Sequence, residues 1–239
     1  MRSVGASHIG KVRSENQDKI FFSDQPVGKL NNLYIVADGM GGHQAGGYAS
    51  SYTVRRFVEE IEQSEEEDPI EVMKMSVSKV NEEILKKCRE DEAYAGMGTT
   101  IVAATVSGSA VTVMNIGDSR LYYGARDLCQ ITVDHSYVEE LVQAGAIRRD
   151  QSRLHPKKNL ITRAVGAASA EPDFFQFEAK DGYLLLCSDG LTNMLDDDEI
   201  RELLLDHSQL ENKVSQMVGR ANEYGGKDNI SLVIVDLKK

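Results

Sequence analysis

Five aspartates stand at the ends of apolar runs that predict β-strands. Asp38, Asp118 and Asp189 follow such runs, and Asp18 and Asp228 precede them. A glycine or asparagine adjoins four of the five, which favours a sharp turn where the backbone can approach a ligand. A single aspartate at a turn is ordinary, but five in equivalent positions indicate a shared function. Carboxylates gathered at one sheet edge would repel one another unless cations lie between them, and oxygen ligands favour Mg²⁺, Mn²⁺ or Ca²⁺ over zinc or copper.

The elements that must position these aspartates are short strands and amphipathic helices. Apolar runs rich in β-branched and aromatic residues predict strands at 20–22, 33–37, 100–106, 110–116, 121–123, 183–188 and 230–235. Helical spacing of apolar residues predicts helices over 54–61, 72–85, 200–205 and 214–221. The sequence SGS between two of the strands is a hairpin signal, so neighbouring strands are expected to be antiparallel. Strands and helices that segregate in this way favour an α+β architecture over alternating βαβ units.

The segment 134–172 is predicted to be an irregular flap that begins with a short helix. The helix runs from Ser136 to Ala144, with Ser136 as N-cap, Glu139 in a capping box and Gly145 at its end. Six basic residues follow with a single acid: Arg148, Arg149, Arg153, Lys157, Lys158 and Arg163. Such a patch would attract acidic, phosphorylated protein segments, although an ordinary solvated loop explains it equally well.

Composition excludes several classes of function. The 239 residues carry a net charge of -11, which argues against nucleic acid or an anionic membrane as the main partner. No stretch resembles a signal peptide or a membrane span, so we expect a cytoplasmic protein. Three widely spaced cysteines suggest neither a disulfide framework nor a zinc site. No linker or repeat is evident, so residues 1–239 are expected to form one domain, and no coiled-coil pattern indicates an oligomer.

Eight motifs in order resemble the metal-dependent protein phosphatases of the 2C type. They are VRSENQD (12–18), VADGMGGH (36–43), GMGTT (96–100), NIGDSR (115–120), TVDHS (132–136), ITRAVG (161–166), CSDGL (187–191) and GGKDNIS (225–231). Each motif alone is weak, but together they span essentially the whole chain. The loop DGMGGH lacks the lysine of a P-loop and the spacing of a dinucleotide fingerprint, which argues against a nucleotide site.

The resemblance implies a fold, a site and a reaction. It implies two antiparallel sheets packed face to face with helices outside each, a four-layer αββα sandwich. It also implies two Mn²⁺ or Mg²⁺ ions, with metal ligands at Asp18, Asp38, the Gly39 carbonyl, Asp189 and Asp228, and a weaker third ion at Asp118. Arg13 matches the family's phosphate-binding arginine, and His43 matches its proposed general acid.

The implied activity is hydrolysis of phosphoserine and phosphothreonine in proteins by water, without a phosphoenzyme. The substrates would be targets of a serine/threonine kinase and the kinase itself, and the enzyme would be a monomer. Two alternatives stay open: a catalytically silent phosphoprotein-binding regulator, and a phosphohydrolase for small molecules. One position departs from the pattern, because Gly47 stands where family members usually carry glutamate. The missing carboxylate would alter a contact around the metal loop without removing a metal ligand.

Overall fold

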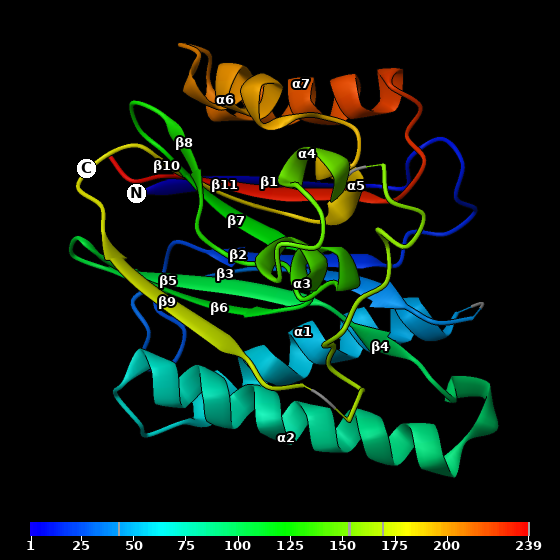
Figure 1. Ribbon diagram of the computed structural model, residues 1–239. Coiled ribbons are helices and arrows are strands. Elements are labelled where there is room, and N and C mark those ends of the chain that lie inside the picture. The colour runs from blue at the N-terminus through cyan, green and yellow to red at the C-terminus, as the bar shows by residue number, and fades with distance from the viewer. Residues whose placement is uncertain (43, 153, 169, 239) are drawn as a thin grey trace.

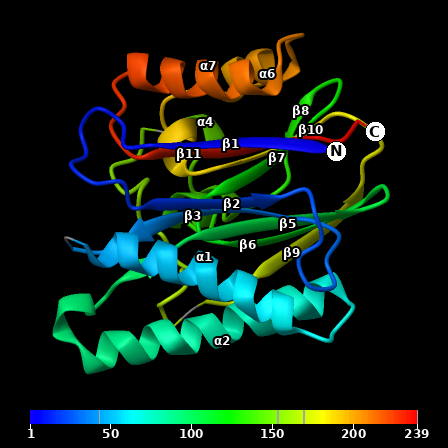
Figure 2. The ribbon, with the colours of Figure 1, turned by 180° about the vertical axis from the view of Figure 1, so that it is seen from behind.

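The strands of the computed structural model form two antiparallel sheets that pack face to face, with helices on both outer faces (Figure 1; Figure 2 shows the opposite side). The structure describes residues 1–42, 44–152, 154–168 and 170–238. Two helices, α1 and α2, cover one sheet, and α6 and α7 cover the other. The predicted four-layer α+β sandwich is therefore confirmed.

The first sheet has the strand order β1-β11-β10-β7-β8. Its strands are β1 (Arg2–His8), β11 (Ile230–Asp236), β10 (Tyr183–Cys187), β7 (Arg120–Gly124) and β8 (Leu128–Gln130). The second sheet has the order β2-β3-β5-β6-β9, with a short strand, β4, beside β3. Its strands are β2 (Asp18–Ser23), β3 (Leu33–Met40), β4 (Gly98–Thr99), β5 (Ile101–Ser107), β6 (Ala110–Ile116) and β9 (Asp173–Glu178).

The helices differ in length according to their place. The long helices that cover the sheets are α1 (Ala45–Gln63), α2 (Pro69–Glu90), α6 (Asp197–Leu205) and α7 (Leu210–Glu223). Shorter helices lie in the connections: η1 (Glu92–Tyr94), α3 (Tyr137–Gln143), α4 (Arg149–Ser152) and α5 (Asp189–Thr192). None of the helices among the described residues is both long and apolar enough to span a lipid bilayer.

Both faces of the central strands are buried, which explains their continuous apolar sequences. In β3, Tyr34 and Val36 pack between the two sheets, whereas Leu33 and Ile35 pack against the helices outside. The same division holds in β11, where alternate residues face the inter-sheet core and the layer formed by α6 and α7. Side chains alternate between the two faces of a strand, so the two sheets build three apolar layers: one between the sheets and one under the helices on each outer face. This rigid stack fixes the strand ends that carry the aspartates.

Four strands were not predicted from the sequence, namely β1, β4, β8 and β9. Both β1 and β9 lie at sheet edges and carry polar or half-buried residues, so their apolar pattern is weak. The two remaining strands have only two and three residues. In β1, a Cβ on Gly5 would lie 3.0 Å from the Phe22 ring, so a larger residue there would require a small shift of its neighbours.

The segment 134–172 contains α3 and α4 and is otherwise irregular. Ser136 caps α3 as predicted, with its Oγ accepting a hydrogen bond from the Glu139 amide. The predicted capping box is wrong in its second half, because the Glu139 carboxylate forms an ion pair with Arg149 instead. A complete capping box occurs at the start of α6, between Asp196 and Glu199.

Candidate functional site

The five aspartates come from strand ends and from the turns next to them, and Asp38 lies inside β3, which runs on to Met40 beyond the predicted end at 37. Asp18 begins β2 and lies directly opposite Asp38 of β3 in the antiparallel register. Asp189 begins α5, immediately after β10. Asp228 lies in the bend before β11, and Asp118 lies in the turn between β6 and β7. The packing of β2 and β3 against β10 and β11 brings these ends together, as their mutual electrostatic effects show.

Neighbouring hydroxyl and amide groups hold the carboxylates in place. The Ser188 hydroxyl donates to Asp18 Oδ2 at 2.8 Å, and Asn193 Nδ2 donates to Asp189 Oδ2 at 2.8 Å. The Asp38 backbone forms two hydrogen bonds with Thr100. The Asp38 amide donates to Thr100 Oγ1 at 2.9 Å, and the Thr100 amide donates to the Asp38 carbonyl at 2.9 Å. These contacts use only part of the hydrogen-bonding capacity of each carboxylate.

The clustered carboxyl groups are electrostatically strained. Loss of hydration raises the pKa of Asp18 to about 6, and repulsion from Asp189 and Asp228 adds to the shift. Loss of hydration is also the largest cause of the raised pKa of Asp38, followed by repulsion from Asp18 and Asp189. Solvent reaches part of Asp38 and Asp189, but protein atoms crowd both carboxyl groups. The pKa of Asp118 is raised by the same two effects, with Asp189 as the main source of repulsion.

Two carboxylate oxygens of the cluster lack a hydrogen-bond donor within the described parts of the chain. Asp18 Oδ1 and Asp189 Oδ1 are both shielded from solvent and unpaired. An unpaired buried carboxylate oxygen is costly unless a cation or a proton satisfies it. No set of three His, Cys, Asp or Glu side chains in the described residues forms a ready-made metal cage. The arrangement nevertheless fits Mg²⁺-like ions, which keep several waters and take one or two carboxylates each.

Arg13 reaches the same cluster from the loop before β2. Its Nη2 donates to Asp228 Oδ2 at 2.7 Å, and 54% of its side chain remains exposed. A cavity of about 530 Å³ opens beside Arg13, with Gly41, Gly42 and Tyr94 among its walls. The guanidinium therefore keeps solvent-exposed donors next to the carboxylates, as a phosphate-binding group requires.

The glycines at 39 and 47, in and just after the motif VADGMGGH, have different structural roles. A Cβ on Gly39 would lie 2.1 Å from the Gly46 carbonyl oxygen, so the loop closes only with glycine at 39. Among the described residues, none would come closer than 3.9 Å to a Cβ on Gly47, so their packing does not exclude a side chain there. The predicted general acid, His43, lies outside the described residues.

Two asparagines of the site were not identified from the sequence as functional. The Oδ1 of Asn229 accepts a hydrogen bond from the backbone amide of Gln17 at 2.8 Å. Its Nδ2 donates to the backbone carbonyls of Ile9 and Glu15, both at 2.9 Å. It therefore fixes the loop that carries Arg13. Asn193 supports Asp189, and the four-residue spacing of the pair at the start of a helix was the available signal.

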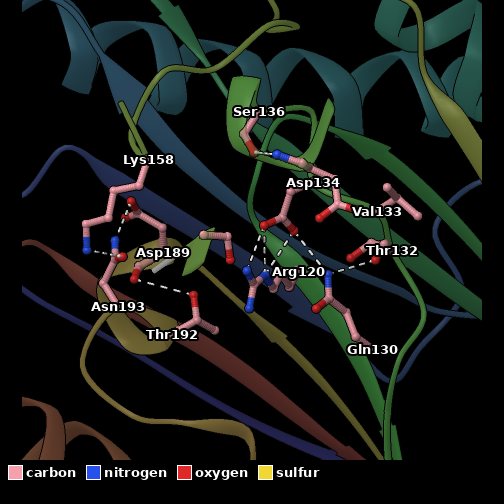
Figure 3. Close-up of polar contacts among 12 residues, drawn as sticks. Arg120, Gln130, Thr132, Val133, Asp134, Ser136, Lys158, Asp189, Thr192 and Asn193 are labelled. Carbon is pink, nitrogen blue, oxygen red and sulfur yellow. Dashed lines mark hydrogen bonds and ion pairs between the residues drawn. The ribbon is translucent and has the colours of Figure 1, made fainter. Parts of the chain in front are cut away.

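A small second cavity, of about 60 Å³, lies between Asp118, Asp189 and the segment 134–172. Figure 3 shows its polar contacts. Among them, Arg120 donates three hydrogen bonds to the Asp134 carboxylate at 2.7–3.1 Å. Lys158 enters this cavity and donates from Nζ to Asn193 Oδ1 at 3.1 Å.

The basic residues of the segment are less available to a partner than the sequence indicated. Arg148, Arg149 and Arg163 pair with Asp150, Glu139 and Asp173 respectively. Lys157 lies over the Tyr137 ring, and Arg153 lies outside the described residues. Internal acidic partners therefore neutralise about half of the predicted patch.

The comparisons with known proteins agree with this geometry. The family model described as Protein phosphatase 2C matches residues 4–231. The serine/threonine phosphatase stp of Listeria innocua is 38% identical, over 95% of this chain and 92% of that protein. The crystal structure of serine/threonine phosphatase Stp1 from Staphylococcus aureus superposes with a TM-score of 0.92 at 31% identity, over 99% of this chain and 95% of that one. The catalytic domain of the phosphatase PstP, solved with two manganese ions, has a TM-score of 0.88 at 30% identity, over 100% and 98% of the two chains. The chain therefore belongs to the protein phosphatase 2C family and is a protein phosphatase.

Proposed function

We propose that this phosphatase hydrolyses phosphoserine and phosphothreonine residues of proteins with divalent cations held by its aspartates. Two ions, Mn²⁺ or Mg²⁺, belong at the core site, and a third, weaker ion belongs at the outer cavity. The core ligands are Asp18, Asp38, the Gly39 carbonyl, Asp189 and Asp228, and the outer ligands are Asp118 and Asp189. When bound, such ions lower the pKa of a water molecule and neutralise charge on the phosphoryl oxygens.

The chain's own residues would orient the substrate. Arg13 would bind two oxygens of the phosphoryl group through the donors that Asp228 leaves free. His43 is proposed as the general acid that protonates the departing seryl or threonyl oxygen. Asn229 would keep Arg13 in register with the carboxylates, because it ties the Arg13 loop to the start of β11.

One observation carries the proposal: four neighbouring carboxyl groups have raised pKa values, and two of them, Asp18 and Asp189, each carry a buried oxygen with no hydrogen-bond donor among the described residues. Such an arrangement is unstable without positive charge and is suited to cations. The manganese ions in the PstP structure support the choice of metal.

Metal-dependent release of phosphate from a phosphothreonine peptide tests the proposal. We expect turnover with Mn²⁺ and none with a chelator, and we expect Asp38→Ala and Asp189→Asn to lower kcat by at least about 10²-fold, since each removes an ion ligand. The control is Asp198→Asn, whose side chain is 94% exposed on α6 and should leave the rate unchanged.

Each alternative function predicts a different result. Folded wild-type protein that binds Mn²⁺ but never releases phosphate would support a silent regulator. Equal kcat/KM on the peptide and on a small aryl phosphate would support a small-molecule phosphohydrolase. A metal-independent rate would contradict the proposed ligands.

We further propose that residues 1–239 act as one monomeric catalytic domain in the cytoplasm, with 134–172 as a flap beside the site. Its substrates are phosphoproteins made by a serine/threonine kinase, and the kinase itself. The family membership and the serine/threonine phosphatases among its relatives support the substrate class. The position of α3 and α4 beside the outer cavity supports the flap.

A further inference from the structure

A chain of two hydrogen bonds links the segment 134–172 to Asp189. Lys158 donates to Asn193 Oδ1 at 3.1 Å, and Asn193 donates from Nδ2 to Asp189 Oδ2 at 2.8 Å. Figure 3 shows Lys158 reaching down from the segment to the Asn193 amide, which in turn contacts the Asp189 carboxylate. Both Lys158 and Asn193 are half-buried at the wall of the outer cavity.

We propose that Asn193 is a positioning residue for Asp189, and that Lys158 acts on Asp189 through it. The proposal rests on the proposed function, because it assigns Asp189 to cation binding. It makes the affinity for the cation depend on a side chain of the flap. Neither residue would touch the substrate or the ion.

The chemistry of the three groups allows only one orientation of the amide. A lysine ammonium can only donate, so it must face the amide oxygen of Asn193. A carboxylate can only accept, so the amide nitrogen must face Asp189. Lys158 thereby prevents rotation of the Asn193 amide, and the amide in turn holds one oxygen of Asp189. The other oxygen, Oδ1, is buried and has no hydrogen-bond donor in the described part of the chain, as a cation ligand should be.

The backbone supports the same geometry. Asn193 ends the short helix that Asp189 begins, and its amide donates to the Asp189 carbonyl at 2.7 Å. The two residues are thus bonded through both main chain and side chain. Groups that orient a metal ligand in this way typically change metal affinity by about 10- to 100-fold when removed.

Neighbouring residues provide matched controls. Lys157 precedes Lys158 in the flap, but its ammonium lies over the Tyr137 ring, 5.2 Å from the centroid. Lys157→Met therefore removes the same charge without breaking the link. Asn159 lines the same cavity and is exposed, so Asn159→Ala controls for loss of an asparagine there.

Calorimetric titration of Mn²⁺ into the full chain tests the positioning role directly. We expect Asn193→Ala to weaken Mn²⁺ binding about 10-fold or more, while Asn159→Ala binds as the wild type does. The melting temperature in chelator should be the same for both variants, which separates positioning from folding. At saturating Mn²⁺, Asn193→Ala should recover most of kcat.

A double-mutant cycle tests the route from Lys158. If Lys158 acts through Asn193, Lys158→Met changes Mn²⁺ affinity more than Lys157→Met does, and the excess disappears when residue 193 is alanine. Lys158→Arg should retain wild-type affinity. An equal effect of Lys158→Met in both backgrounds would reduce its role to long-range charge and overturn the link.

The two proposals fail in different ways. Wild-type affinity in Asn193→Ala would overturn the positioning role and leave the metal-dependent phosphatase intact. A wild-type protein that binds no Mn²⁺ at all would overturn the proposed function, and the positioning role with it.

Discussion

Buried charged groups in this chain are of two kinds, those that have a partner within the protein and those that do not have one among the described residues. Lys213 is completely buried in α7, yet its Nζ contacts the Asp206 Oδ1 at 2.5 Å and the Asp206 carbonyl at 2.6 Å. The Tyr183 ring lies on the same ammonium, 5.0 Å away. The aspartates of the site have no such partners for Asp18 Oδ1 and Asp189 Oδ1 within the described chain. The ion pair between Lys213 and Asp206 stabilises the fold, whereas carboxylate oxygens without a partner are available to a ligand.

The Lys213–Asp206 pair makes a prediction about acid stability. Burial of Asp206 opposes its ionisation, but hydrogen bonds from Lys213 and Ser208 outweigh this and lower the pKa of Asp206 to about 2. A carboxyl group with a lowered pKa stabilises the fold above its unfolded pKa of about 3.9, and this stabilisation is lost as the pH falls from about 4 to 2. We expect Asp206→Asn to lower the free energy of unfolding at pH 7 by about 2–3 kcal/mol, since Asp206 is one-third exposed and partly screened.

Denaturant titrations at several pH values measure this difference. The gap between wild type and Asp206→Asn should close as the pH approaches 2, because the wild type then loses the same charge. Asp150→Asn is the control, since its partner Arg148 and Asp150 itself are both exposed. A gap that stays constant over this pH range would show that Asp206 contributes by packing alone.

At the scale of elements, α5 is the connection on which the site depends most closely. It runs from Asp189 to Thr192 with Asn193 as its C-cap, and it packs against β11 and α7. A Cβ on Gly190 would lie 1.9 Å from the Asn229 carbonyl oxygen. This contact is with backbone and cannot be relieved by a side-chain rotation. The distance between Asp189 and the Asp228 turn is therefore set by a glycine.

Gly190→Ala should accordingly destabilise the protein and weaken Mn²⁺ binding. We expect a loss of about 2 kcal/mol or more in the free energy of unfolding, since overpacking against backbone forces the turn apart. Gly219→Ala gives the opposite result: Gly219 lies in the exposed middle of α7, where an added Cβ would have no atom within 4 Å, so alanine should stabilise the helix by about 0.5–1 kcal/mol. Thermal unfolding in chelator measures both, and a neutral Gly190→Ala would contradict the proposed close contact.

The elements that could be predicted from the sequence are those in which buried residues form an unbroken or regularly spaced apolar pattern. Strands such as β3 and β11 are buried on both faces, so their apolar runs are unbroken, whereas β1 at a sheet edge carries a mixed pattern. The aspartates were found because turns and strand ends are local features. The role of Asn229 depends on a partner 220 residues away, and no local pattern encodes such a contact. Asn193 lies four residues after Asp189, which is a local signal, but its contact with Lys158, 35 residues away, is not encoded locally.

At the scale of the whole molecule, the fold brings together negative charges whose mutual repulsion destabilises it. The net charge is -11, and the sandwich brings four aspartates with raised pKa values to one edge. The three apolar layers supply the stability that tolerates this repulsion. The metal-free protein should therefore be less stable than a variant with one of these charges removed, which is a common consequence of a functional site.

Asp38→Asn tests this exchange between stability and function. In chelator, we expect the variant to melt at a higher temperature than the wild type, because an amide replaces a carboxyl group crowded by Asp18 and Asp189. Mn²⁺ at about 100 times its Kd should stabilise the wild type by about 2.7 kcal/mol, or roughly 5–10 °C for a chain of this size, and should leave Asp38→Asn almost unchanged. The order of the two melting temperatures would thus reverse on adding metal. Calorimetric scans of both proteins in chelator and in Mn²⁺ measure these melting temperatures. If the variant melts at a lower temperature than the wild type in chelator, Asp38 stabilises the fold itself. Repulsion between the carboxylates would then not be the reason that the site binds cations.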